Sequence, residues 1–498
     1  MAERRFYITT AIPYVNADPH VGFALEAVQT DVLARHRRLR GDPVRFASGT
    51  DDNSLKNVIA AREAGVPIDR FVDAKARRFA GLSGELALSY DDFLRTSVDP
   101  RHRAGVERLW RACAARGDLY ERDYEGLYCV GCEAFLSADG LDRDGACPEH
   151  RRRPDRVAER NWFFRLSRYE DELFAAIENE RLRIEPEQRR NEVLAFVRRG
   201  LEDFSVSRSA ERAAGWGVPV PDDPAQVVSV WFDALANYVS ALDYGTGAES
   251  YDLWWEEAAE RVHVVGKGIV HFHAVHWPAF LLSAGAALPT AIFVHDYLTV
   301  NGEKLSKSRG GAADPGVVAS RYGRDALRWW FARDVRLAAD ADFREELVAA
   351  RGNELADGLG NLVNRTLALA DGRELAGACD VPHDGRALLE AGRRLPVLVD
   401  EALGRFDLAA AAEAIWSVVV EANRFVASTR PWELRKRAER DEEAARRLDG
   451  VLGLLLETIR TLTHELRPFL PDGAARIERV LETRDRELGR RLFAKASG

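Results

Sequence analysis

Lysine and methionine are nearly absent from this sequence of 498 residues, which has seven lysines against 64 arginines and a single methionine, Met1. A coding bias that replaces lysine by arginine and removes methionine wherever this is tolerated accounts for both shortages. A lysine that survives such a bias stands where arginine cannot replace its compact ammonium group. Three of the seven are Lys267, Lys304 and Lys307, which makes them the first candidates for functional residues.

Long apolar runs and an excess of positive charge are also missing. No apolar segment approaches the roughly 20 residues that cross a bilayer, and the apolar stretch in residues 1–15 is too short for a signal peptide. We therefore expect a cytoplasmic protein that makes no contact with a membrane. The net charge of −9 excludes the global basic field of many nucleic-acid binders, so that any such binding would depend on local patches.

The chain is longer than one hydrophobic core usually accommodates, so two to four domains are expected. Short apolar runs alternate with helical patterns over residues 1–115 and again over 226–300, which predicts an α/β fold with the two halves of one parallel, Rossmann-type sheet. Residues 116–225 contain clustered cysteines and end with a proline-rich segment, which indicates a module inserted between these halves. Residues 351–498 are almost purely helical in pattern and predict a separate bundle.

The first predicted helix follows directly after the first predicted strand. Asp18 is expected as its N-cap, with Pro19 in the first turn and Gly41 just past the end. His20 and Gly22 then lie at the helix N-terminus, where unpaired N–H groups and the helix dipole favour an anion.

Four metal-ligand residues form the most specific pattern. Cys129 and Cys132 are separated by two residues, and Cys147 and His150 follow with the same spacing after a gap of fourteen. In a cytosolic chain this spacing predicts a metal site and not a set of disulfides. Three thiolates and one imidazole complete a tetrahedral Zn²⁺ site with no open position for substrate. We predict one structural zinc ion that folds a small knuckle.

The segment 300–311 concentrates groups that suit phosphate. Lys304, Ser306, Lys307 and Ser308 fall within five residues, and glycines flank them on both sides. Lysine ammonium groups act as compact charges on phosphate, and small flanking residues let the backbone approach it.

Taken together, these motifs resemble those of the class I aminoacyl-tRNA synthetases. "HVGF" at residues 20–23 is similar to the HIGH signature, and "KLSKS" at 304–308 is similar to KMSKS. Over essentially its whole length the chain resembles the methionyl-tRNA synthetase family. The resemblance implies a Rossmann-type catalytic domain that is split by a zinc-knuckle connective peptide, a KMSKS-like loop and stem-contact region over 301–350, and an α-helical anticodon-binding domain.

The resemblance also implies a two-step reaction. The carboxylate of L-methionine attacks the α-phosphate of ATP, which is bound with Mg²⁺, and the 3′ end of a methionine tRNA then accepts the methionyl group. Charge builds on the phosphates in the first step, where cations and helix N-terminal groups stabilise it. The implied catalytic residues are His20, Lys304 and Lys307. The implied ATP-binding residues are His20, Gly22, Phe23, Gly266, Lys267, Lys304, Ser306 and Lys307. A monomer is expected.

Two further sets of positions match the family. The implied methionine pocket comprises Ile12, Tyr14, Asp51, Arg208, Trp231, Ala234, Tyr238, Ile269, Phe272 and His273. Asp51 matches the carboxylate that receives the substrate ammonium, Arg208 matches an arginine that closes on the intermediate, and aromatic edges suit a thioether. Asn361, Arg365 and Trp432 match residues that read the anticodon by stacking on splayed bases, although Trp432 alone would equally fit core packing against Pro431.

The sequence departs from the family near the nucleotide. Phe23 replaces a histidine, Asn53 and Ser54 replace histidine and glycine, and Gly268 replaces an acidic residue. Each lost hydrogen bond would cost about 1–3 kcal/mol if nothing replaces it. Three functions therefore remain open: a working methionine–tRNA ligase, a synthetase-like amino-acid ligase of specialised metabolism that passes the acyl group to a small nucleophile, and a catalytically inactive RNA-binding relative.

Overall fold

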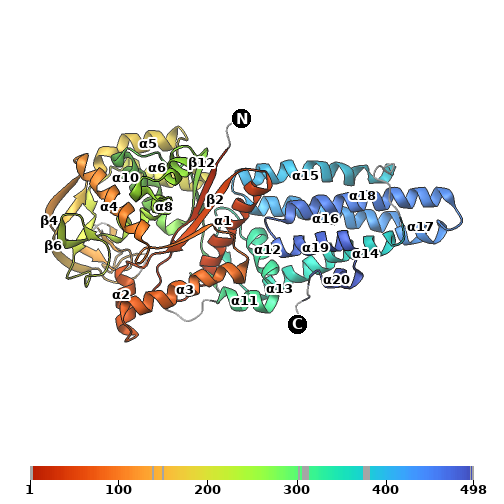
Figure 1. Ribbon diagram of the computed structural model, residues 1–498, viewed down its shortest axis with the longest axis horizontal. Coiled ribbons are helices and arrows are strands. Elements are labelled where there is room, and N and C mark those ends of the chain that lie inside the picture. Colours follow the sequence, from red (N-terminus) through yellow and green to blue (C-terminus); the bar gives the residue numbers. More distant parts are fainter. Residues whose placement is uncertain are drawn as a thin grey trace. The chain divides into compact units, whose positions relative to one another are not determined.

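The computed structural model describes residues 4–136, 140–148, 151–300, 303–304, 313–373, 382–493 and 495. The chain divides into two compact units (Figure 1). The first comprises Met1–Thr30, Gly41–Ser83 and Ser89–Asp296, and the second comprises Asp31–Arg40, Gly84–Leu88 and Tyr297–Gly498.

A six-stranded sheet with the order β3-β2-β1-β12-β13-β7 forms the centre of the first unit. All neighbouring strands in it run parallel. Because β1 lies between β2 and β12, the strand order reverses direction there, and the crevice beyond the carboxyl ends of β1 and β12 is where such sheets bind ligands. This confirms the predicted Rossmann-type parallel sheet. The strands are β1 (Phe6–Thr10), β2 (Val44–Thr50), β3 (Asp92–Arg95), β7 (Arg183–Glu185), β12 (Glu260–Gly266) and β13 (Ala291–His295).

Helix α1 (Val21–Leu39) begins two residues later than the sequence suggests. The carbonyl of His20 accepts the first hydrogen bonds, from the N–H groups of Phe23 and Ala24. The prediction of Asp18 as N-cap was wrong, because its carboxylate lies 2.9 Å from the ammonium of Lys75 on α3 (Ile68–Leu86). Gly41, just past the end of α1, has φ +88° as expected for a residue that terminates a helix.

The segment between the two halves of the sheet forms two small antiparallel sheets, with the orders β5-β4-β6-β8 and β10-β11-β9. The same segment also supplies β7 to the edge of the parallel sheet, where Ile184 is buried. The strands are β4 (Leu119–Cys129), β5 (Ala134–Leu136), β6 (Asp155–Phe164), β8 (Phe204–Ser205), β9 (Ser207–Ser209), β10 (Pro219–Val220) and β11 (Asp223–Val228).

The helices of the first unit mostly connect these strands. They bury a core that includes Trp110, Phe164, Phe232 and Phe280, which meet edge-to-face or tilted. Besides α1 and α3, the longer ones are α2 (Leu55–Glu63), α4 (Pro100–Ala115), α5 (Glu170–Glu178), α6 (Glu187–Arg198) and α10 (Trp277–Ala284).

The second unit is predominantly helical, as predicted for its C-terminal part (Figure 1). A small sheet of β14 (Leu298–Val300), β15 (Glu303–Lys304) and β16 (Ala341–Asp342) precedes most of the helices. These are α11 (Pro315–Tyr322), α12 (Arg324–Asp334), α13 (Glu345–Glu354), α14 (Asn361–Ala370), α15 (Arg386–Gly404), α16 (Leu408–Thr429), α17 (Pro431–Arg437), α18 (Glu442–Leu466), α19 (Pro471–Thr483) and α20 (Arg486–Arg490).

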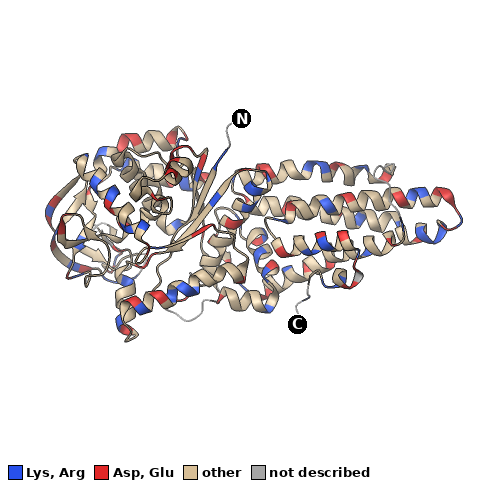
Figure 2. Ribbon diagram, in the orientation of Figure 1, with Lys and Arg blue, Asp and Glu red and all other residues tan. Residues whose placement is uncertain are grey.

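Both signs of charge are distributed along the elements of each unit (Figure 2). This fits the absence of a global basic field in the sequence. Among the described residues, no helix combines the length and low polarity needed to cross a lipid bilayer.

Candidate active site

The residues implied for the amino-acid pocket come from separate segments of the first unit. Ile12 and Tyr14 follow β1, Asp51 follows β2, and Arg208 lies on β9. The others lie on four short helical segments: α7 (Val230–Leu235), α8 (Asn237–Ser240), and the two turns after β12, Lys267–Ile269 and Phe272–His276.

Three aromatic side chains from different segments meet in this region. Trp231 stacks on Phe272 with ring centroids 3.7 Å apart and an interplanar angle of 7°. Tyr14 presents its ring at 70° to that of Trp231, 6.5 Å away. Stacked and edge-on rings form a flat apolar wall whose edges suit a polarisable thioether.

Tyr238 and His273 add a buried, uncharged hydrogen bond. The Nδ1 of His273 lies 2.8 Å from the carbonyl of Ile269 and carries the hydrogen, because a carbonyl only accepts. Its Nε2 therefore accepts from the Tyr238 hydroxyl, at 2.7 Å. Burial lowers the pKa of His273 to about 4, so the imidazole is neutral at neutral pH.

Asp51 is the acidic residue of the pocket and is 2% exposed. Burial raises the pKa of its carboxyl well above the ordinary value, and the carboxylates of Asp233, Glu133 and Asp52 raise it further. A cation placed beside Asp51 would relieve this repulsion, so the site favours a positively charged group such as an ammonium.

The unusual residue Asn53 is integrated into the same region. Its side-chain amide donates to a carboxylate oxygen of Asp233 at 2.9 Å, and the other oxygen of Asp233 lies 3.0 Å from Nε2 of His102. Its backbone carbonyl accepts a hydrogen bond of 3.1 Å from the guanidinium of Arg208. The amide of Asn53 therefore satisfies one oxygen of Asp233, and His102 lies beside the other.

On the nucleotide side, His20 lies just before α1. The N–H of Gly22 donates to Nδ1 of His20 at 3.1 Å, so that Nε2 carries the hydrogen and can donate. Phe23, one residue later, packs with Phe79 of α3 in an apolar cluster that also contains Val15 and Val72.

Lys267 forms an ion pair with an acidic residue that the sequence pattern did not predict. Its ammonium lies 3.3 Å from the carboxylate of Asp296, which directly follows β13 and also pairs with Arg189. Gly268 has no side chain, so the carboxylate that pairs with Lys267 is that of Asp296, at the end of the neighbouring strand β13.

Next to Asp296, His295 forms a pair with Glu26 at 2.9 Å. Burial lowers the pKa of His295, but the Glu26 carboxylate outweighs this effect, and the net shift of the pKa is upward.

Ser306 and Lys307 lie outside the described residues. Lys304 is described only as part of strand β15, which pairs antiparallel with β14. The prediction that this motif binds phosphate therefore stays a prediction.

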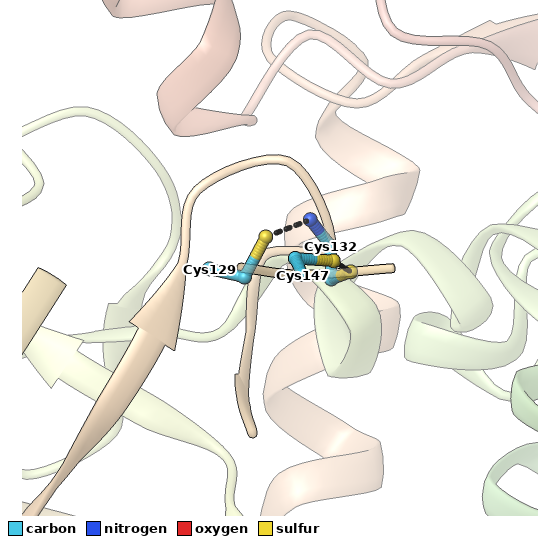
Figure 3. Close-up of side chains that lie close together, drawn as sticks. All are labelled: Cys129, Cys132 and Cys147. Carbon is cyan, nitrogen blue, oxygen red and sulfur yellow. Dashed lines mark hydrogen bonds between the residues drawn. The ribbon is translucent and has the colours of Figure 1, made fainter. Parts of the chain in front are cut away.

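Three of the four predicted metal ligands come together at the end of β4 (Figure 3). The sulfur atoms of Cys129, Cys132 and Cys147 all lie within 4.8 Å of one another, and those of Cys132 and Cys147 are 3.6 Å apart. Two thiolates bound tetrahedrally to zinc would be about 3.8 Å apart, given Zn–S bonds of roughly 2.3 Å. The three cysteines are thus arranged to hold a metal ion, and His150 lies outside the described residues.

The electrostatics of these thiols agree with that arrangement. Burial raises the pKa of Cys129 and of Cys132, and for Cys132 the neighbouring sulfurs add to the effect. A divalent cation offsets the effect of burial and the repulsion between the sulfurs, because its positive charge stabilises the thiolates that bind it.

Two of the three predicted anticodon residues are in contact in the second unit. The guanidinium of Arg365, on α14, lies over the ring of Trp432, on α17, with 5.4 Å to the ring centroid. Trp432 is 38% exposed, which argues against a core role. Asn361 begins α14, one turn before Arg365.

No sequence motif predicted five further residues of this region: Glu133, Asp233, His102, Asp296 and Glu26. Glu133 directly follows Cys132 and is buried between elements far apart in sequence. Asp296 directly follows a strand, which is the one signal that could have identified it.

Comparison with known proteins agrees with this geometry. A family model described as tRNA synthetases class I (M) matches residues 6–159 and 150–367. A methionine–tRNA ligase of Thermotoga maritima is 38% identical over 483 residues, covering 95% of this chain and 75% of the relative. One of Brucella suis biovar 1 is 37% identical over 493 residues, covering 97% and 92%. The structure of Mycobacterium tuberculosis methionyl-tRNA synthetase in complex with methionyl-adenylate matches with a TM-score of 0.90 at 37% identity, covering 95% of this chain and 93% of that one. The chain therefore belongs to the methionyl-tRNA synthetase family of class I aminoacyl-tRNA synthetases.

Proposed function

We propose that the protein is a methionine–tRNA ligase, which activates L-methionine with ATP and transfers it to the 3′ end of methionine tRNA. The observation that carries this proposal is the aromatic wall of Tyr14, Trp231 and Phe272 in the same unit as the buried carboxylate of Asp51. Such a site offers a polarisable apolar surface to a thioether and an anion to an ammonium group.

In this proposal the substrate ammonium binds at Asp51 and the side chain lies against the aromatic wall. The neutral Tyr238–His273 pair adds no charge to the pocket, so a charged side chain would lose its hydration without gaining a partner there. The pocket therefore favours an uncharged amino-acid side chain of methionine's length and polarisability.

The first step needs no general base, because the attacking carboxylate is already ionised. One carboxylate oxygen forms a bond to the α-phosphorus, the bond to the β-phosphate bridging oxygen breaks, and pyrophosphate leaves. We assign charge stabilisation to His20, Lys267, Lys304 and Lys307, with Gly22, Phe23, Gly266 and Ser306 completing the nucleotide site. Mg²⁺ bound to ATP would neutralise phosphate charge in the same step.

The zinc knuckle is assigned a structural role. Cys129, Cys132, Cys147 and His150 would hold one Zn²⁺ in a closed tetrahedral set, which leaves no position for substrate. The tRNA is assigned to the second unit, where Asn361, Arg365 and Trp432 would read the anticodon through base stacking and hydrogen bonds.

Amino-acid-dependent ATP–pyrophosphate exchange, followed by charging of methionine tRNA, tests the proposal. Methionine is expected to support both reactions, and Asp51→Asn to reduce exchange strongly. Asp69→Asn, an exposed carboxylate on α3, is the matched control and should behave like the unmodified protein. Exchange without charging would instead indicate a ligase that uses a small nucleophile, and no exchange with any amino acid would indicate an inactive relative.

A further inference from the structure

The turn that follows the second cysteine of the knuckle reaches into the amino-acid site. Glu133, next to Cys132, has φ +52°, a left-handed conformation that non-glycine residues seldom adopt. Its side chain is almost completely buried. A buried carboxylate in a strained turn needs partners that offset its lost hydration.

Glu133 has three such partners. One carboxylate oxygen accepts from the hydroxyl of Ser54 and, at 3.1 Å, from the N–H of Lys56 at the start of α2. The other oxygen lies 3.4 Å from Nη1 of Arg208. The carboxylate thus joins the beginning of α2 to the arginine that the family resemblance places near the reaction intermediate.

Arg208 is itself buried, with 4% of its side chain exposed. Its guanidinium donates to the Glu133 carboxylate through Nη1 and to the Asn53 carbonyl through Nη2, and it also interacts with the Tyr128 hydroxyl. Because the carbonyl is uncharged, Glu133 is the anion that hydrogen-bonds the guanidinium, and the Asp51 carboxylate also stabilises its charge. Without that charge the guanidinium would lose its hydrogen-bonded counter-ion.

The preceding residue makes a second contact of the same kind. The carbonyl of Cys132 accepts a hydrogen bond of 3.0 Å from the indole N–H of Trp231, which stacks on Phe272. Two consecutive residues of one turn therefore hold two side chains of the candidate pocket. The turn is held in place on its other side, where the N–H of Cys132 donates to the sulfur of Cys129.

We propose that Glu133 is a positioning residue for the activation step, which acts by orienting the guanidinium of Arg208. This inference rests on the proposed function, since it assumes that Arg208 contacts the substrate or the adenylate. Glu133 touches neither, and its main effect on catalysis passes through Arg208; after burial and Asp233, its carboxylate also raises the pKa of Asp51.

A double-mutant cycle between Glu133→Gln and Arg208→Ala tests this role, with methionine-dependent pyrophosphate exchange as the readout. Glutamine keeps the shape of position 133 and one accepting oxygen, but its amide nitrogen cannot accept from Arg208, so the charge and that contact are removed together. In the unmodified background, Glu133→Gln is expected to lower kcat/KM for methionine about tenfold, as expected for loss of a charge-assisted contact, with the KM for ATP unchanged. In the Arg208→Ala background the same change should have less than about a twofold effect, because the group that Glu133 orients is gone.

Glu125→Gln is the matched control. Glu125 lies on β4 of the same small sheet, is exposed, and forms an ion pair with Arg156. Its removal should leave exchange unchanged. Zinc content and the melting temperature are measured for each variant, so that loss of the knuckle is separated from misorientation of Arg208. Glu133→Asp, which keeps the charge, should recover part of the lost activity.

Several results would overturn the inference. A tenfold loss in both backgrounds would show that Glu133 acts independently of Arg208, and unchanged exchange in Glu133→Gln would show that it does not act at all. If both Glu133→Gln and Glu133→Asp lose zinc and fail to fold, the residue is structural and the inference is wrong. Absence of exchange in the unmodified protein would instead refute the proposed function.

Discussion

Phe23 packs its ring edge-to-face on Phe79, with ring centroids 5.1 Å apart and an interplanar angle of 79°. Phe79 is buried on α3, together with Val72 and Ala76 of the same helix. The phenylalanine that stands in place of the last histidine of the HIGH signature thus packs the start of α1 against α3. An apolar side chain suits position 23 because the side chains around it are apolar.

Phe23→His should therefore destabilise the protein even though it recreates the family signature. The edge-to-face pair contributes about 0.5–1.5 kcal/mol beyond its burial, and a half-buried imidazole would need a polar partner. We expect a lower melting temperature in differential scanning calorimetry. Val98→His, at a site that is 63% exposed in the same unit, should have little effect. An unchanged or higher melting temperature for Phe23→His would contradict the packing role.

Methionine affinity should depend on pH through Asp51. Its carboxyl pKa is raised in the protein alone, while binding an ammonium requires the ionised form. Affinity should therefore be highest above the raised pKa and fall as pH decreases through it. Titration calorimetry at a series of decreasing pH values would detect this as an early loss of affinity, whereas a carboxylate near its usual value of about 3.9 would keep the affinity constant until the pH approaches that value.

Asp51→Asn provides the check on that assignment. The amide does not titrate, so the variant should bind methionine weakly and with no pH dependence over the same interval. A pH profile that persists in Asp51→Asn would assign the titration to another group.

Purified protein should contain about one zinc ion per chain, because the three thiols are close enough to share one ion. Cys147→Ser should reduce the zinc content to near zero in elemental analysis. Cys113→Ser is the control, because Cys113 is a buried thiol that is not part of the cysteine group. Equal zinc in all three proteins would refute the knuckle as the metal site.

Trp432→Ala should weaken charging of methionine tRNA while leaving pyrophosphate exchange nearly intact. Stacking of a base on an aromatic ring contributes about 1–3 kcal/mol, which corresponds to roughly 5- to 150-fold in kcat/KM for tRNA. Val420→Ala, at an exposed apolar position of α16 in the same unit, should change neither assay. A similar loss of both reactions in Trp432→Ala would argue against an anticodon role.

Much of the architecture could be predicted because it depends on local pattern. Apolar runs and turn residues placed β1, β2 and β12, and the parallel sheet brings residues that follow these strands to one edge. The C-x2-C spacing identified Cys129 and Cys132 in the same way, since it is a property of a few adjacent residues.

The remaining features depend on partners that are distant in sequence. Asp18 has the residue type and spacing of an N-cap, but its carboxylate pairs with Lys75 and the helix begins later. Asp296 becomes the partner of Lys267 only because β12 and β13 are neighbours in the sheet. Glu133 lies buried in a turn where it adopts a left-handed conformation, and no residue pattern predicts this turn.

The hydrogen bonds around Asn53 also constrain how the protein is made. Asn53 is joined to Arg208 across 155 residues and to Asp233 across 180, while Tyr7 of the first strand is joined to Tyr238 across 231. Contacts of such separation form late in folding, because long loops must close before they form. During synthesis, the amino-acid site therefore remains incomplete until α8 and the turns after β12 have left the ribosome. A truncated N-terminal fragment would contain the knuckle but no pocket.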